Sequence, residues 1–393
     1  MKITILKRFA NMALCCSLAL LGMQSIAAEK SATKQGYVYT LNNDLTHNGI
    51  AVFHHTTDGA LREVPGSPFP TGGKGTNGGD IDEQGAIRTH GKFVLAVNPG
   101  SHTIAVLQKM DKGELRPVHG SPFPSGGSTP LSIAVHGDLV YVANQAPEWA
   151  KPTVKPNITG FRLLEDGHLE SISGSTMEGP VGQGPAQIEF SPDGRTLVVT
   201  AGFQDEKANR IYSYKVLASG KLMAGPGSPA MTKGASGTVG YSWLPSSDRI
   251  LVSNFRGSAI TVFDINSTDG GIAQKGGTYG NGEAAACWTA ISADGKTLYV
   301  ANFVSNSVST FDVATDGRLL LLGNTPRRDA SDKPDTKDLV LSQDGKHLYV
   351  LGSGQKQLSV FNIGSDRLPV ELPMGQSPLV LTKGQNITGL ATD

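Results

Sequence analysis

Seven copies of one strand pattern, about fifty residues apart, constrain the fold of this 393-residue chain more than any other feature. Each copy has a short apolar strand, a tight turn, a second strand that ends near an asparagine, a polar loop and a third strand. The second strands begin near Tyr37, Phe93, Leu139, Leu197, Ile250, Leu298 and Leu348. A small sheet with two apolar faces cannot bury both alone, and stacking around an axis solves this. The pattern predicts an all-β, seven-bladed β-propeller with four antiparallel strands per blade.

Turns and chain ends support this interpretation. Asp-Gly pairs stand at 58–59, 166–167, 193–194, 294–295, 316–317 and 344–345, and they favour hairpin turns that need a positive φ. The first recognisable strand, residues 37–41, has no innermost strand before it. The final segment, residues 386–391, resembles an innermost strand with no blade after it. We therefore predict that the C-terminal strand completes blade one and closes the ring.

The first 28 residues are typical of a secretory signal peptide. Lys2, Lys7 and Arg8 precede an apolar run and small residues suited to cleavage. The alternative, a membrane anchor, is disfavoured because the run is too short to span about 30 Å as a helix. We expect a signal peptide at 1–28, a short lead at 29–35 and the propeller at 36–393. Export to the periplasm or the medium follows, with no membrane span in the mature protein.

Charge and cysteine counts narrow the function. The chain has 34 basic and 34 acidic residues, which argues against a strongly basic nucleic-acid-binding protein. The mature part keeps only Cys287, so it can form no intramolecular disulfide. The sequence contains no P-loop, no dinucleotide-binding fingerprint, no Gly-x-Ser-x-Gly motif and no metal-ligand spacing. We expect no cofactor, no metal and no nucleic acid, and a monomer that takes a small anionic or hydroxylated ligand.

Five segments together resemble a known family: residues 82–86, 129–137, 184–187, 286–288 and 342–351. They are similar to the lactonase-like seven-bladed propellers, which include bacterial 6-phosphogluconolactonase and fungal carboxymuconate lactonising enzyme, and most of all to an exported branch. The resemblance implies a site at the mouth of the central channel, where the family enzymes use a His with Arg and Glu. The position of that His is Gln187 here, and an amide cannot exchange a proton near neutral pH.

Polar and aromatic residues at the starts of the innermost strands form the predicted site. We predict a ligand-binding ring made of Gln84, Ser132, Gln187, Tyr241, Trp288 and Asp338. Arg256 or Arg327 would hold a carboxylate, and Glu283 would direct water at a carbonyl as the catalytic base. Structural alternatives stay open: the arginines could be solvated, and Trp288 could belong to the core.

Two functions follow from these observations. The first is an exported lactonase-like enzyme that hydrolyses or isomerises a small anionic lactone or sugar acid at the channel mouth. The second is a non-catalytic propeller that binds a ligand or another protein, which the missing His favours. Fold alone does not decide between them.

Overall fold

The computed structural model describes residues 36–56, 59–76, 84–146, 154–202, 209–328, 333–381 and 387–393. The predicted signal peptide and the lead lie outside these residues. Gly36–Asp393 form one compact unit. In the described part of the chain, the single helical element is the short 3-10 turn η1 (Asp111–Gly113). No described helix is long and apolar enough to cross a bilayer.

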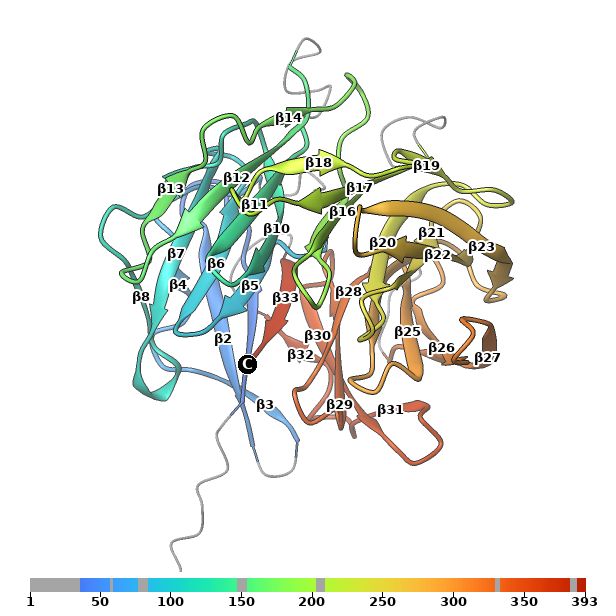
Figure 1. The fold of residues 1–393 in the computed structure, drawn as a ribbon. Helices are drawn as coiled ribbons and strands as arrows, with labels where there is room; N and C mark the ends of the chain where they lie inside the picture. Colours follow the sequence, from blue (N-terminus) through green and yellow to red (C-terminus); the bar gives the residue numbers. More distant parts are fainter. Residues whose placement is uncertain are drawn as a thin grey trace, which may run out of the picture. The chain divides into compact units, whose positions relative to one another are not determined.

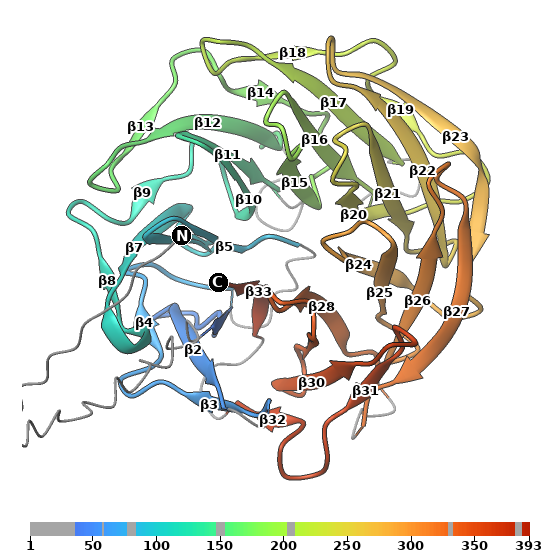
Figure 2. The ribbon, with the colours of Figure 1, turned by 60° about the horizontal axis from the view of Figure 1, so that its bottom comes forward.

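Seven antiparallel sheets stand around a central axis, which confirms the predicted propeller (Figures 1 and 2). The innermost strands, from blade one to blade seven, are β33 (Thr388–Thr392), β5 (Ile87–His90), β10 (Pro130–His136), β15 (Gln187–Phe190), β20 (Thr238–Trp243), β24 (Ala286–Ile291) and β28 (Thr336–Leu341). The second strands are β1 (Tyr37–Leu41), β6 (Phe93–Asn98), β11 (Leu139–Asn144), β16 (Thr196–Ala201), β21 (Arg249–Asn254), β25 (Thr297–Asn302) and β29 (His347–Gly352). Each second strand begins within one residue of the predicted position.

The outer half of each blade holds a third strand and an edge strand. The third strands are β2 (Gly49–His55), β7 (Thr103–Lys109), β12 (Asn157–Leu163), β17 (Arg210–Val216), β22 (Ala259–Asn266), β26 (Ser307–Val313) and β30 (Gln357–Ile363). The edge strands are β3 (Leu61–Glu63), β8 (Leu115–Pro117), β13 (Leu169–Ser171), β18 (Leu222–Ala224), β23 (Gly271–Gly280), β27 (Leu319–Pro326) and β31 (Pro369–Glu371). Five blades add a two-residue strand: β4 (Phe69–Pro70), β9 (Phe123–Pro124), β14 (Met177–Glu178), β19 (Ala230–Met231) and β32 (Leu379–Val380).

The turn between the first two strands of a blade is set by a local side-chain network. In blade six, the Ser292 hydroxyl donates to Asp294 Oδ1 at 2.6 Å, and the same oxygen accepts the Lys296 amide at 3.0 Å. Gly295 follows with φ 72°, a conformation that costs glycine little. The glycines of all six predicted Asp-Gly pairs have positive φ. The pairs at 193–194, 294–295 and 344–345 lie in this first turn, and the other three lie between a third strand and an edge strand. In blades four, six and seven, local turn chemistry therefore determines where the innermost strand ends.

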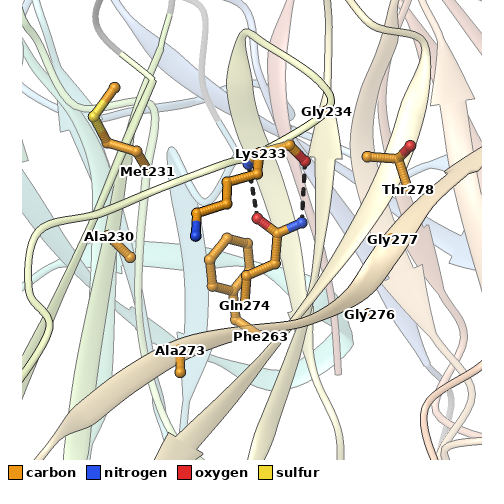
Figure 3. Close-up of a pocket in the computed structure, with 10 residues that line it drawn as sticks. All are labelled: Ala230, Met231, Lys233, Gly234, Phe263, Ala273, Gln274, Gly276, Gly277 and Thr278. Atoms are coloured by element: carbon orange, nitrogen blue, oxygen red, sulfur yellow. Dashed lines mark hydrogen bonds between the residues drawn. The ribbon is translucent and has the colours of Figure 1, made fainter.

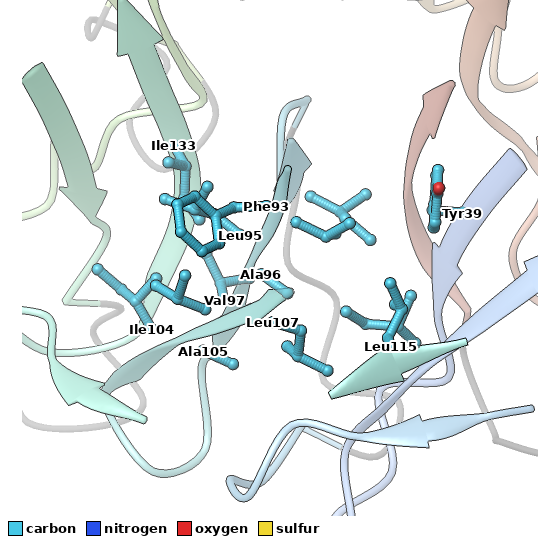
Figure 4. Close-up of a cluster of buried hydrophobic side chains, with 14 of the residues drawn as sticks. Tyr39, Phe93, Leu95, Ala96, Val97, Ile104, Ala105, Leu107, Leu115 and Ile133 are labelled. Carbon is cyan, nitrogen blue, oxygen red and sulfur yellow. The ribbon is translucent and has the colours of Figure 1, made fainter. Parts of the chain in front are cut away.

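Contacts between blades form the core. Tyrosine recurs at the third position of four second strands, as Tyr39, Tyr141, Tyr299 and Tyr349, and each is almost fully buried. The hydroxyl groups of Tyr141, Tyr299 and Tyr349 reach a neighbouring blade, as when Tyr141 donates to the Gly220 carbonyl at 2.8 Å, whereas Tyr39 bonds to Asp393 of its own blade. Figure 4 shows Tyr39 in the apolar cluster around blade two. Each ring thus buries apolar area while its polar atom is satisfied.

The C-terminal strand closes the ring, as predicted. Strand β33 pairs antiparallel with β1, for example Val38 with Thr392. The terminal residue reinforces the closure, because the Asp393 carboxylate accepts from Tyr39 Oη at 2.8 Å and from Lys109 Nζ at 3.0 Å. Blade one is therefore built from both ends of the propeller.

The chain itself crosses the central channel just before β5 (Figure 2). We call residues 84–86 the axial segment. Gln84 pairs with Gln187 of blade four through a parallel bridge. Its amide nitrogen donates to the Thr289 carbonyl of blade six at 2.8 Å and to Asp338 Oδ1 of blade seven at 3.3 Å. Gln84 thus connects blade two to blade four through its backbone and to blades six and seven through its side chain.

Deleting residues 385–393 should destabilise the whole ring rather than fray one blade, since β33 is the innermost strand of blade one; residues 385 and 386 lie outside the described residues. Leu390→Ala should lower the free energy of unfolding by about 2–5 kcal/mol, because this side chain is 5% exposed between blades. Thermal unfolding measures the stability of the deletion variant and of Leu390→Ala.

Val370→Ala is the control, because Val370 is 64% exposed, and its free energy of unfolding should stay within about 0.5 kcal/mol of the unmodified protein. A deletion variant that melts normally would show that the closure is dispensable.

Gln84→Met should lower stability although the residue keeps its length. The substitution leaves the Thr289 backbone and Asp338 without the amide, and each unsatisfied buried group costs about 1–3 kcal/mol. Denaturant unfolding should show the loss, with Gln343→Met in an exposed turn as the matched control. Equal midpoints for the two variants would mean that the axial segment does not hold the blades.

Candidate functional site

The innermost strands leave backbone groups facing the axis, and side chains of other blades satisfy them. An unpaired buried N–H or C=O costs about as much as a lost hydrogen bond. Backbone groups of five of the seven innermost strands, at Ile133, Ile188, Tyr241, Thr289 and Leu390, bond to residues of another blade. This set of contacts, the axial belt, explains why polar residues gather at the centre.

The axial belt uses five of the six predicted ligand-binding residues. The Ser132 hydroxyl donates to the Gln84 carbonyl and accepts the Ile188 amide at 3.1 Å. Asp338 Oδ2 accepts the Leu390 amide at 2.9 Å. The predicted ring does come together, and its polar atoms bond mostly to one another and to backbone. Their role as ligand contacts stays a prediction.

Gln187, at the position of the family His, is one of these belt residues. Its amide oxygen accepts the Tyr241 amide at 2.8 Å, and its nitrogen donates to the Tyr241 carbonyl at 3.0 Å. The side chain is 1% exposed. This pair of hydrogen bonds to the Tyr241 backbone needs one donor and one acceptor in fixed positions. The glutamine amide supplies both without any proton exchange.

Trp288 and Cys287 lie in a small apolar cluster with Ala186 and Val239. Trp288 is completely buried, and Cys287 is a buried cysteine that is not part of a disulfide in the described residues. The half-buried rings of Phe255 and Phe303 pack against the cluster, with their centroids 6.3 Å apart. This geometry suits the core interpretation of Trp288, since no face of the indole is open to a ligand.

Arg327 is buried between blades six and seven. Its guanidinium faces Asp335 at 3.4 Å and donates to Thr336 Oγ1 at 3.2 Å, to Ser359 Oγ and to Gln357 Oε1. Burial lowers the pKa of Arg327, although Asp335 opposes this. Its charge is balanced by Asp335 and its donors are occupied. Arg327 therefore has the geometry of a structural residue that joins blades six and seven.

Arg256 and Glu283 lie on adjoining loops at the entrance end of the channel, where the innermost strands begin. The Ser258 hydroxyl accepts the Ala285 amide at 2.8 Å, which holds the two loops together. Arg256 is exposed and Glu283 is half-buried. The structure thus brings these two predicted residues to one face, while Arg327 is buried away from solvent.

A different pair of charged residues stands beside the axial segment. Arg88 of β5 and Glu189 of β15 form an ion pair with Nη1 and Oε1 3.7 Å apart. Arg88 Nε donates to the Ile133 carbonyl at 2.9 Å, and Gln187 Nε2 donates to Glu189 Oε2 at 3.2 Å. The pair therefore adjoins the position of the family His.

Glu189 and Asp338 both titrate abnormally at the axis. Burial raises the pKa of Glu189, an effect that Arg88 and the Gln187 amide partly offset. Its side chain remains 34% accessible, yet it lies deep among protein atoms, so desolvation still dominates. Burial also raises the pKa of Asp338 to about 7, opposed by backbone amides and by Arg88. Carboxyl groups tuned in this way are typical of acid–base sites.

The Arg88–Glu189 pair is not saturated, unlike Arg327. A separation of 3.7 Å is too long for a direct hydrogen bond and leaves room for a bridging oxygen. Among the described residues, Arg88 Nη2 is buried and has no hydrogen-bond partner. Nη2 can therefore serve only an enclosed water molecule, whereas Nη1, opposite Glu189, is the donor that a ligand could use.

Solvent reaches this pair from the turn end of the channel, where the innermost strands lead into their first turns. The first residue of every innermost strand is buried. In β5, β10, β24, β28 and β33, only later residues are accessible. The accessible part of the channel therefore lies opposite the predicted entrance face.

Arg88 and Glu189 were not among the sequence candidates. Glu189 lies two residues after Gln187 on one strand, so the period-2 alternation places both on the same side. Arg88 lies four residues after Gln84, but Gly85 between them has φ 88°, so the alternation does not link this pair. That spacing was visible in the sequence, but the crossing of the axis by residues 84–86, which brings the two strands together, was not.

Other features of the surface do not add to this site. A groove of about 650 Å³ lies at the rim between blades four and five, where the Lys233 amide donates to Gln274 Oε1 at 2.7 Å (Figure 3). It is lined by β19, β22 and β23, far from the axis. In the described ranges, no group of three His, Cys, Asp or Glu side chains could hold a metal ion.

Comparison with known proteins agrees with the architecture. Residues 274–372 match the family model for lactonase, 7-bladed β-propeller. The chain is 25% identical over 279 residues to the 6-phosphogluconolactonase of Klebsiella pneumoniae strain 342, an alignment that covers 70% of this chain and 78% of that protein.

Solved structures show the same fold. A protein from Lactobacillus plantarum superimposes with a TM-score of 0.72 at 18% identity, covering 91% of this chain and 99% of that one. The periplasmic gluconolactonase of Pseudomonas aeruginosa gives 0.69 at 16% identity, with 91% and 99% coverage. These comparisons support the family resemblance seen in the sequence: this chain is a seven-bladed β-propeller that is similar to the lactonase family and to the 6-phosphogluconolactonases.

Proposed function

We propose that this protein is an exported enzyme that opens a small lactone at the turn end of its central channel, with Arg88 and Glu189 as its catalytic pair. The observation that carries the proposal is the unsaturated ion pair: a guanidinium with spare donors faces a partly accessible carboxyl group whose pKa is raised. The similarity to lactonases supplies the reaction class, and the two side chains, 26% and 34% exposed, are accessible enough to meet a small molecule.

The two residues divide the chemistry of lactone hydrolysis. The Glu189 carboxylate takes a proton from a water molecule as the water oxygen bonds to the lactone carbonyl carbon. Arg88 donates to the carbonyl oxygen, which becomes negatively charged. The ring C–O bond then breaks, and the departing alkoxide oxygen receives the proton from Glu189. The product is a hydroxy acid, and the enzyme returns to its starting state.

The entrance face offers a second location for the same reaction. There Arg256 would hold a carboxylate and Glu283 would direct water, as the sequence predicts, on loops that Ser258 joins. Arg327 would contribute only if its bonds to Asp335 and Thr336 were broken. Variants at the two ends of the channel separate these locations.

A binding protein without catalysis is the competing function. It is favoured by Gln187, whose amide is committed to the Tyr241 backbone where the family enzymes use a His. In that case the Arg88–Glu189 pair would hold an anionic or hydroxylated ligand and release it unchanged. Turnover of any lactone by the purified mature chain distinguishes the two functions.

Export rests on residues 1–28, which have the character of a signal peptide. A periplasmic location is also the one named for the structurally similar gluconolactonase of Pseudomonas aeruginosa. Fractionating cells that express the full chain, followed by N-terminal sequencing of the mature protein, tests this part of the proposal. Intact protein in the cytoplasm would contradict it.

Glu189→Gln should lower kcat/KM for a hydrolysed lactone by about 10²–10⁴-fold, because the amide keeps the shape but cannot accept the proton. In the unmodified enzyme, activity should fall on the acid side at a pH above 4.5, the ordinary glutamic acid value, because protonation of Glu189 removes the base. Acid release in a pH-stat measures both effects, and the acid limb should vanish from the residual activity of the variant.

Glu283→Gln is the matched control at the entrance face, and a melting curve for each variant shows that the fold is retained. We expect this control to keep normal kcat/KM. The reverse result, with Glu283→Gln inactive and Glu189→Gln normal, would move the active site to the entrance face.

A further inference from the structure

The charged residues of the innermost strands are few and unevenly placed. The described innermost strands carry six acidic, basic or histidine side chains: Arg88, His90, His136, Glu189, Lys337 and Asp338. Lys337 precedes Asp338 in β28 and so lies toward the entrance end. It is 4% exposed, and burial lowers its pKa to about 7. His136 stands at the far end of β10 and packs over the Gly194 turn of blade four. Arg88 is therefore the one permanent cation of the described innermost strands on the turn side of the axial segment.

We infer that the ligand of the Arg88–Glu189 site is an unphosphorylated lactone or hydroxy acid that carries at most one negative charge. This inference rests on the proposed function and adds the substrate class to it. It follows from charge and spacing: one guanidinium faces the Glu189 carboxyl group at 3.7 Å and lies near that of Asp338.

A phosphate monoester brings a charge of about −1.5 to −2 near neutral pH. Phosphate sites normally gather several donors, such as arginine clusters or strand-to-helix glycine loops. Here a phosphoryl group would meet one guanidinium and the Glu189 carboxyl group, with the buried carboxyl group of Asp338 close by and strand edges whose backbone groups the axial belt already occupies. Like charges placed together in a poorly hydrated channel are strongly unfavourable.

An uncharged lactone avoids this cost. Its carbonyl oxygen needs one or two donors, which Arg88 can supply while Glu189 stays in place. The hydroxy acid product carries one carboxylate, and one guanidinium balances it. The site thus fits the lactone and the hydroxy acid product when neither is phosphorylated, and it fits neither of them when they carry a phosphate.

The inference separates this chain from the function named for its curated relative. The Klebsiella protein is named for a phosphorylated lactone, whereas the Pseudomonas protein is named as a gluconolactonase. Local charge at the axis, rather than either name, decides the substrate class here.

The test compares gluconolactone with 6-phosphogluconolactone in a pH-stat, and gluconate with 6-phosphogluconate by calorimetry, using the mature chain. We expect turnover and binding of the unphosphorylated compounds only, with kcat/KM lower by at least about 100-fold for the phosphorylated lactone. Equal or faster turnover of the phosphorylated lactone would overturn the inference and leave the lactonase proposal standing. Gluconate binding without turnover would support the inference while removing the catalytic proposal. Binding of neither product would remove both.

A charge variant adds an independent readout. Glu189→Gln removes one negative charge, so it should improve 6-phosphogluconate binding relative to gluconate by about tenfold. Glu283→Gln at the entrance face should leave that ratio unchanged. An identical ratio in all three proteins would show that Glu189 does not set the charge preference.

Discussion

The backbone edges that face the axis are the constraint on which this structure depends. Seven innermost strands point N–H and C=O groups at a channel too narrow to hydrate them all, and each unmet group costs stability. Gln84, Gln187, Ser132 and Asp338 satisfy these groups from other blades. The centre of the ring is consequently a hydrogen-bonded belt crossed by the chain itself, and only what the belt leaves unused is open to a ligand.

The architecture could be predicted from the sequence because it repeats. Apolar strands return about every fifty residues, Asp-Gly pairs mark several of their turns, and the unmatched first and last strands predict the closure by β33. Local rules of turn chemistry and alternation are enough for such features, since each acts within a few residues.

The candidate site was less predictable, for a physical reason. Whether a buried polar residue satisfies backbone or remains free for a ligand depends on contacts between blades, which the repeat pattern does not encode. Arg327 and Arg88 look alike in the sequence, yet one is matched by Asp335 and three further oxygens while the other keeps spare donors. Glu189 could not be identified because no residue near it in the sequence indicates that β5 and β15 meet at the axis.

The closure of blade one by β33 also affects how the ring folds. Strand β33 pairs with β1, and the hydrogen bond from Tyr39 to Asp393 joins residues that are 354 positions apart in the sequence. Bringing such distant segments together carries a loop-closure entropy cost that hairpins within one blade do not have. Blades made of consecutive strands can therefore form early, whereas the contact that turns an open row of sheets into a closed ring belongs to a slower, later step of folding.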